Sequence, residues 1–192
     1  MAGYNMQLLK SGDHRRMPWK NGGGVTIEIA VFPTDASVDN FDWRVSTATV
    51  ASDGAFSVFS GIDRTLSVLE GDGIILSVEG LEEQELKGET PPFPFPADSP
   101  TSAKLLGSAI TDLNVMTRRG RFAHQVIRHP ISGDTVLSLS GTTVLVFCGS
   151  GSVQTNDTQL EVNDCLRFEQ CSNTELQLSG SGTVFVIALN PV

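Results

Sequence analysis

Four polar side chains on two neighbouring strand-like segments could together bind a small anion. Thr26 and Glu28 share one face of the first segment, and Arg44 and Ser46 share one face of the second. If the segments pair as antiparallel strands, the guanidinium, the carboxylate and the two hydroxyls come together. A guanidinium binds a carboxylate through two parallel hydrogen bonds, so these residue types predict recognition of an organic acid.

The same two segments leave open which face lines an interior. If the polar face points inward, a cavity contains Arg44 and Glu28; otherwise the alternate apolar residues from Val25 to Val31 fill it and Arg44 lies in solvent. The polar interior is preferred, because the opposite face, with Trp43 and the Ile/Val row, suits packing between sheets or between chains. A buried arginine is costly unless it is paired. Its partner could be Glu28, as a structural salt bridge, or the carboxylate of a ligand.

Other residues have side chains suited to a ligand. Trp19 either offers a flat face to a planar ring of a ligand or packs in the core. A Lys-Asn-Gly-Gly-Gly run follows it, and its glycines let the backbone approach a ligand closely. Arg64 either adds a cation at the mouth of the interior or forms a turn pair with Asp63. Three alternate residues of a later strand could also line this cavity, or a second one. The candidate ligand-binding residues are Trp19, Lys20, Asn21, Gly22, Thr26, Glu28, Arg44, Ser46, Arg64, Asp112, Asn114 and Met116.

No catalytic residue is assigned by these patterns. Glu28 or Asp112 could act as a general base in a reaction without a cofactor. Ser46 has no histidine beside it in the sequence, and none of the three cysteines stands in a catalytic signature. A binding protein is therefore preferred, with an enzyme as the alternative.

Short strands must position these side chains. The 19 glycines and 9 prolines separate short apolar runs, and no amphipathic helix of three turns is evident. An internal repeat relates LSVLEGDGIILS to VLVFCGSGSVQT, in each of which an apolar strand leads through Gly-x-Gly into a second strand. The first copy reads as a hairpin within 64–78. Together with the Asn163-Asp164 turn after the second copy, the repeat is typical of small cupin barrels.

We therefore predict an all-β, RmlC-like double cupin, that is, a two-repeat β-barrel or jelly roll. Its halves are expected at residues 1–80 and 105–192. The Pro-rich stretch 81–104 lies between them as a crossover or an exposed excursion, because proline cannot donate to the ladder of a central strand.

A metal centre is not expected in this barrel. Metal-dependent cupins carry two histidines two residues apart, a glutamate and a later histidine. The three histidines here are His14, His124 and His129, none of which lies beside a Gly-x-Gly segment. We predict neither a metal site nor a cofactor.

The net charge and the cysteines limit the kinds of binding partner and the cellular compartment that we expect. The net charge of −9 argues against nucleic acid and against an anionic membrane surface. An odd number of cysteines without C-x-x-C spacing suits free thiols in a reducing compartment. Residues 1–10 lack the apolar core of a signal peptide, so a cytoplasmic location is expected. The apolar Val/Ile/Trp face would also suit a homodimer or another protein partner.

Three segments resemble the signatures of the HutD/Ves family, of which HutD is associated with histidine utilisation operons. They are MPWKNGGGVTIEI at 17–29, the run from Phe41 to Arg64 with its FDWRVS and FSVF motifs, and DLNVMTRRG at 112–120. The resemblance covers essentially the whole chain. It implies a double cupin without the usual metal ligands, which binds a histidine-breakdown intermediate such as urocanate or formylglutamate and modulates histidine catabolism. An enzyme that acts on such an intermediate is the alternative.

Overall fold

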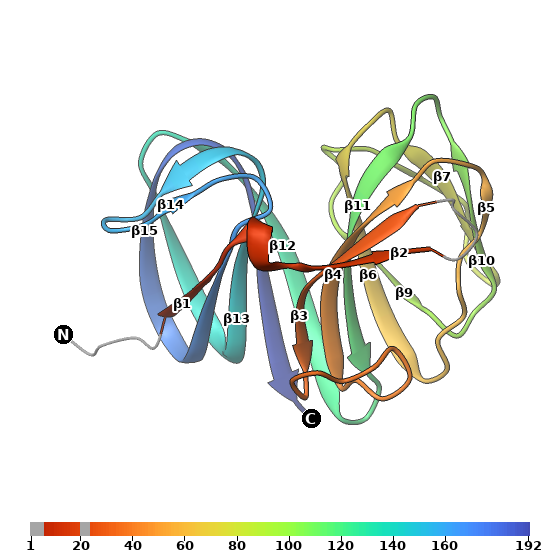
Figure 1. The fold of residues 1–192 in the computed structure, drawn as a ribbon, viewed down its shortest axis with the longest axis horizontal. Helices are drawn as coiled ribbons and strands as arrows, with labels where there is room; N and C mark the ends of the chain where they lie inside the picture. Colours follow the sequence, from red (N-terminus) through yellow and green to blue (C-terminus); the bar gives the residue numbers. More distant parts are fainter. Residues whose placement is uncertain (1–5, 20–23) are drawn as a thin grey trace. The chain divides into compact units, whose positions relative to one another are not determined.

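The computed structural model describes residues 6–19 and 24–192, which fold into strands and loops with a 3₁₀ turn at Ser11–Asp13 (η1) (Figure 1). The all-β prediction is confirmed. Among the described residues, no helix is both long enough and apolar enough to span a membrane.

The chain divides into two compact units, and the division differs from the predicted one. The central unit is Arg15–Ala123, and the terminal unit combines Met1–His14 with His124–Val192. The expected boundary at 81–104 therefore falls inside the central unit. The reason is that this Pro-rich stretch supplies strands to both sheets of the central unit instead of leaving it.

The central unit contains a six-stranded and a four-stranded antiparallel sheet. The larger sheet has the order β2 (Arg15–Pro18), β3 (Val25–Phe32), β4 (Trp43–Val50), β11 (Ile110–Arg118), β6 (Ile62–Glu70) and β9 (Phe93–Pro96). The smaller sheet has the order β5 (Gly54–Ala55), β10 (Thr101–Leu105), β7 (Ile74–Val78) and β8 (Gln84–Leu86).

Two expectations about these strands need correction. The Pro-rich stretch enters the larger sheet as β9, at the end of the strand order, where a missing N–H does not interrupt a ladder. Residues 64–78 do not form a hairpin, because β6 and β7 belong to different sheets. Gly71 and Gly73 between them have φ values of +95° and +105°, which glycine adopts without strain, and the turn carries the chain from one sheet to the other.

Strand register determines which side chains share the inner face of the larger sheet. Directly paired residues point to the same side, and β11 pairs Asn114 with Ser46 on β4 and Met116 with both Arg44 and Arg64. The polar face of these strands is therefore one continuous surface across β4, β11 and β6.

A bulge on β3 changes one predicted face. Glu28 pairs with Ser46 and Ala30 with Val45, so Ile29 is an extra residue on β3. Beyond it the alternation shifts, and Val31 lies opposite Arg44 on the polar side. The predicted row from Val25 to Val31 is wrong at this last residue.

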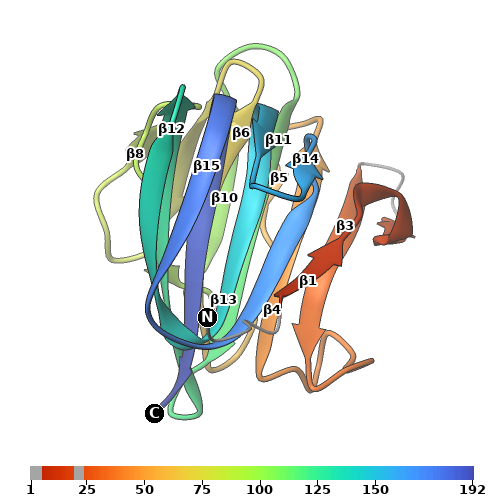
Figure 2. The same ribbon diagram turned by 90° about the vertical axis from the view of Figure 1, so that its left-hand side faces the viewer.

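The terminal unit is a separate β structure with long strands. Its elements are β1 (Met6–Leu9), β12 (Phe122–Ser132), β13 (Thr135–Gln154), β14 (Gln159–Leu160) and β15 (Cys165–Pro191). Val144 of β13 pairs with both Phe168 and Ala188, so the middle of β13 lies between two segments of β15. Figure 2 shows these long curved strands with β12 beside β15. An apolar cluster that includes Leu139 and Val146 fills the interior.

The second Gly-x-Gly segment has a role other than the one predicted. It does not end a strand, because β13 continues through it from residue 135 to 154. Gly151 instead faces β15 so closely that a Cβ there would lie 2.1 Å from the Ser181 carbonyl oxygen. The two copies of the repeat thus share residue types without sharing a local structure.

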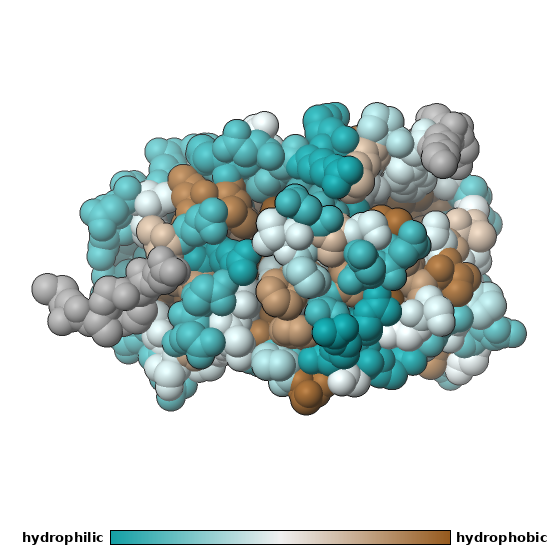
Figure 3. All heavy atoms as spheres, turned by 60° about the horizontal axis from the view of Figure 1, so that its bottom comes forward, coloured by the Kyte–Doolittle hydropathy of each residue, from teal (hydrophilic) through white to brown (hydrophobic). Residues whose placement is uncertain are grey.

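Apolar side chains on the surface are scattered. On the face drawn in Figure 3, brown groups are small and separated by polar residues. Val58 and Val136 are each 58 % exposed, but they lie in different units.

Candidate functional site

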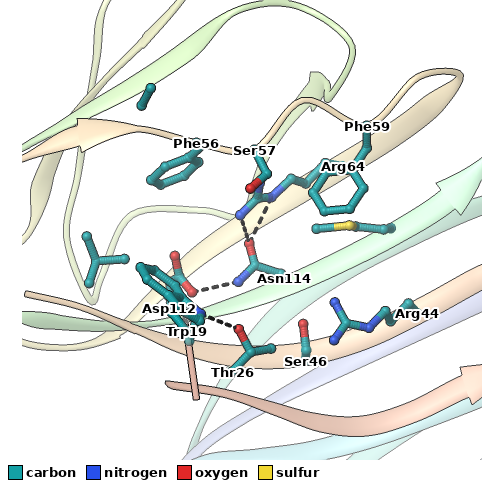
Figure 4. A pocket seen from close by; sticks show the side chains of 14 residues that line it. Trp19, Thr26, Arg44, Ser46, Phe56, Ser57, Phe59, Arg64, Asp112 and Asn114 are labelled. Carbon is teal, nitrogen blue, oxygen red and sulfur yellow. Dashed lines mark hydrogen bonds between the residues drawn. The ribbon is translucent and has the colours of Figure 1, made fainter. Parts of the chain in front are cut away.

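A cavity of about 400 Å³ opens within the central unit, against the polar face of its larger sheet. Strands β3, β4, β6 and β11 supply its polar wall, and the segment after β5 supplies aromatic rings (Figure 4). The lining residues are Trp19, Thr26, Arg44, Ser46, Ala48, Val50, Ala55, Phe56, Ser57, Phe59, Arg64, Asp112, Asn114 and Met116.

Arg44 is held by a structural partner. It is 5 % exposed, and its Nε donates to Glu28 Oε2 over 2.7 Å. Both side chains are largely buried, so the attraction between them is screened less by water than that of a surface pair. The predicted contact between Arg44 and Glu28 is confirmed, and the polar face of the two strands points inward.

Arg64 has a different environment. Its Nε donates to Asn114 Oδ1 over 2.9 Å, and its Nη2 donates to the same oxygen. Its guanidinium carbon lies 4.8 Å from the ring centroid of Phe56 and 5.6 Å from that of Phe95. Cation–π attraction and two hydrogen bonds stabilise the charge, but among the described residues no carboxylate lies within ion-pair distance of it.

Asn114 links Arg64 to Asp112. While its carbonyl oxygen accepts from Arg64, its Nδ2 donates to Asp112 Oδ1 over 2.6 Å. Figure 4 shows this chain of three side chains running from β6 across β11. The other carboxylate oxygen of Asp112, Oδ2, is buried and has no hydrogen-bond partner in the described structure.

Burial shifts the pKa values of both charged ends of this chain. It lowers the pKa of Arg64 to about 10, although Asp112 opposes the shift and Arg44 adds to it. It raises the pKa of Asp112 to about 6, although the charge of Arg64 and the hydrogen bond from Asn114 work in the other direction. Burial thus disfavours the charged form of both groups, and their mutual attraction favours it.

Trp19 closes one side of the cavity. Its Nε1 donates to Thr26 Oγ1 over 2.8 Å, and its ring packs on the apolar cluster beside the cavity. The Trp19 backbone N–H donates to the Gly24 carbonyl over 2.9 Å. A Cβ on Gly24 would lie 2.4 Å from the Thr49 carbonyl oxygen, so only glycine fits there without a shift. The candidates Lys20, Asn21 and Gly22 lie outside the described residues.

The structure brings the remaining candidates together. Glu28 reaches the site through Arg44, and all the others line the cavity. Sequence reasoning missed six lining residues: Ala48, Val50, Ala55, Phe56, Ser57 and Phe59. Ala48 and Val50 could have been found by continuing the alternation of β4. The short apolar run that contains Phe56 and Phe59 gave no sign that its rings approach a cation.

The cavity contains no paired nucleophile and base among its described residues. Ser46 lies in it without a histidine among the lining residues. The three cysteines belong to the terminal unit and are buried, and burial raises the pKa of the Cys148 thiol to about 11. Within residues 6–19 and 24–192, no group of three His, Cys, Asp or Glu side chains is placed to hold a metal ion.

Comparison with known sequences gives a consistent assignment. A family model described as HutD matches residues 11–186. An uncharacterised 21.2 kDa protein in the hutC 3′ region of Pseudomonas putida is 39 % identical over 176 residues, covering 89 % of this chain and 90 % of the relative. The protein Ves of Citrobacter koseri is 37 % identical over 152 residues, covering 77 % and 76 %.

Comparison with solved structures supports both the family and the fold. A conserved protein of unknown function from Pseudomonas aeruginosa PAO1 has a TM-score of 0.86, and HutD from Pseudomonas fluorescens SBW25 has one of 0.81. Each is 32 % identical, covering 97 % of this chain and 99 % of the other. YhhW from Escherichia coli, a cupin-type pirin that is 10 % identical, has a TM-score of 0.70 over 97 % and 98 %. The predicted double-cupin fold is confirmed.

Proposed function

The chain belongs to the HutD family, which is linked to histidine utilisation genes, and on this basis we propose that it binds a small carboxylate metabolite in the cavity of its central unit and thereby modulates histidine catabolism. Urocanate and formylglutamate are the candidate ligands. Both combine a carboxylate with a second polar group, and both are small enough for a cavity of about 400 Å³.

The observation that carries the proposal is the buried guanidinium of Arg64. It is 8 % exposed and lines the cavity, and its hydrogen bonds go to a neutral amide and not to a carboxylate. Asp112 influences the charge of Arg64 without bonding it, so the guanidinium donors that Asn114 does not use can bind an anionic ligand. Arg44, by contrast, already has Glu28.

The affinity expected of such a site is moderate. One arginine clamp and a few hydrogen bonds should provide about −5 to −8 kcal/mol, which corresponds to roughly 200 μM down to micromolar affinity. Dissociation constants in this range suit the sensing or buffering of a pathway intermediate.

Isothermal titration with urocanate and with formylglutamate tests the proposal, and methyl urocanate serves as the matched ligand without a carboxylate. We expect at least one of the acids to bind and the ester to bind at least tenfold more weakly. No heat with either acid up to several millimolar would reject the proposed ligands. Equal binding of acid and ester would reject the carboxylate clamp.

A second candidate function is catalysis with Asp112 as the general base. Two observations favour it: Oδ2 of Asp112 is unpartnered, and its pKa of about 6 is close to that of an effective base at neutral pH. Incubation of the protein with formylglutamate or formiminoglutamate, followed by NMR, separates this candidate from pure binding. Turnover that is lost in Asp112→Asn would support an enzyme, and unchanged substrate would exclude these reactions.

A further inference from the structure

The carboxylate of Asp112 presents a hydrogen-bonding requirement that the charge of Arg64 does not explain. Asp112 is 1 % exposed and lines the cavity, and only one of its two oxygens is bonded. A buried carboxylate oxygen without a donor is destabilising, and native proteins rarely leave one unpaired. The missing partner is a donor, because an ionised carboxylate can only accept.

The arrangement of the neighbouring groups limits where that donor can come from. Asn114 uses its amide N–H₂ on Oδ1 of Asp112 and its oxygen on Arg64. Trp19 is the nearby ring donor of the cavity wall, and its N–H is already given to Thr26. The Ala48 backbone N–H lies near enough to lower the pKa of Asp112, yet Oδ2 has no hydrogen-bond partner in the described structure. A molecule inside the cavity can supply the missing donor.

The wall therefore has two unlike poles joined by an amide. At the Arg64 pole it offers donors to an anion, and at the Asp112 pole it offers an acceptor to an N–H or O–H group. We propose that Asp112 is the specificity-determining residue of this site, and that it selects carboxylic acids which also carry an N–H donor, such as N-acyl amino acids and azole-substituted acids. This inference rests on the proposed carboxylate site and names its ligand class more closely.

Two pairs of probes isolate the N–H group. The first pair is 3-(pyrrol-3-yl)acrylate and 3-(furan-3-yl)acrylate, which differ only in a ring N–H that becomes an oxygen and which do not titrate on the ring. The second pair is N-acetylglutamate and 2-acetoxyglutarate, in which an amide N–H becomes an ester oxygen. Each pair keeps its carboxylates, so the Arg64 pole is unchanged.

Titration of the full chain with each pair gives a selectivity ratio. We expect the N–H member of at least one pair to bind roughly ten- to hundredfold more tightly, because its oxygen analogue places a lone pair against the Asp112 carboxylate. In Asp112→Asn the ratio should fall towards one, since an amide can turn either its N–H₂ or its oxygen to the ligand. The matched control is Asp35→Asn, at an exposed position of the same unit, which should keep the wild-type ratio.

The outcomes separate this inference from the proposed function. Equal binding within both pairs by the wild-type protein would overturn the role of Asp112 and leave the carboxylate site standing. An unchanged ratio in Asp112→Asn would also overturn it. If no probe of either pair binds and the candidate acids do not bind either, the carboxylate site itself fails and the inference fails with it.

Discussion

On β13 of the terminal unit, alternate positions hold Val144, Val146 and Cys148, whereas on β11 of the central unit they hold Asp112, Asn114 and Met116. The first set is completely buried in an apolar cluster. The second set lines a cavity of about 400 Å³. Within one chain, inward-facing strand positions therefore serve two purposes.

The difference shows what keeps an interior open. Apolar side chains gain free energy by closing gaps, and the apolar cluster around Val144 and Val146 is filled accordingly. In the central unit, guanidinium, amide and carboxylate groups are held by one another along the sheet and cannot collapse onto apolar neighbours without losing their hydrogen bonds. The cavity is thus maintained by polar groups that bond to one another along its wall and not across the space, and Oδ2 of Asp112 is left without a partner.

A charge placed in the apolar cluster of the terminal unit should have the greatest effect on stability. Val146→Asp should lower the free energy of unfolding by about 3–5 kcal/mol, because nothing in the apolar cluster can pair with the carboxylate. Urea denaturation measures the loss. Val136→Asp, on the same strand at a position 58 % exposed, is the control and should change stability by less than about 0.5 kcal/mol. A stable Val146→Asp protein would show that the two interiors are not as different as described.

Removal of one arginine from each unit compares their roles in binding. Arg64→Gln should weaken binding of a carboxylate ligand by roughly 30- to 150-fold, about 2–3 kcal/mol, because the buried donors are lost. Arg167→Gln removes the same charge from the terminal unit, where Arg167 bonds Glu169 over 2.7 Å, and should leave the affinity nearly unchanged. Calorimetry measures the affinity of both variants for the carboxylate ligand. Equal losses would attribute the effect to net charge and not to the cavity.

Ionisation of Asp112 in the cavity should lower the free energy of unfolding, so the stability of the protein should depend on pH. Because burial raises the pKa of Asp112 from 3.8 to about 6, the unfolded chain releases this proton at lower pH than the folded chain does. The contribution of Asp112 to stability is therefore greatest below about pH 4 and is lost as pH rises through about 6.

Asp112→Asn removes that cost. At pH 7.5 it should raise the free energy of unfolding by about 2 kcal/mol, and at pH 4 the gain should vanish. Urea denaturation at the two pH values is the measurement, with Asp35→Asn as the exposed control. A gain that is equal at both pH values would mean that packing, and not ionisation, is responsible.

The smallest expected effect concerns the paired arginine. Glu28→Gln removes the charge that neutralises Arg44, so a carboxylate ligand should bind about fivefold more tightly, or about 1 kcal/mol. Glu175→Gln makes the same charge change at an exposed site of the terminal unit and should have little effect on affinity. Weaker binding in Glu28→Gln would instead show that Glu28 positions Arg44 for the ligand.

Sequence alternation alone was enough to identify the polar strand residues of the cavity wall. Because side chains of a strand alternate with a period of two, Arg44 and Ser46 had to share a face, as did Asp112 and Asn114. The proximity of β3 and β4 along the chain was enough to expect the contact of Arg44 with Glu28, which the structure contains. The all-β fold followed from the same local patterns.

Features that depend on pairing between strands far apart in the sequence could not be predicted from local alternation. The bulge at Ile29, the placement of β6 and β7 in separate sheets, and the entry of the Pro-rich stretch into the central unit all depend on strands far away in the sequence. The aromatic ring of Phe56 over the Arg64 guanidinium has no local sequence signature either.

The side chains that share one face of a strand can be read from the sequence, because that alternation is a property of the extended backbone. Which of the two described cavity arginines has a carboxylate partner, and that Oδ2 of Asp112 has no partner, became visible only in the folded structure. Charge balance in a buried site depends on which strands become neighbours, and neighbours in a sheet are chosen by the packing of the whole unit.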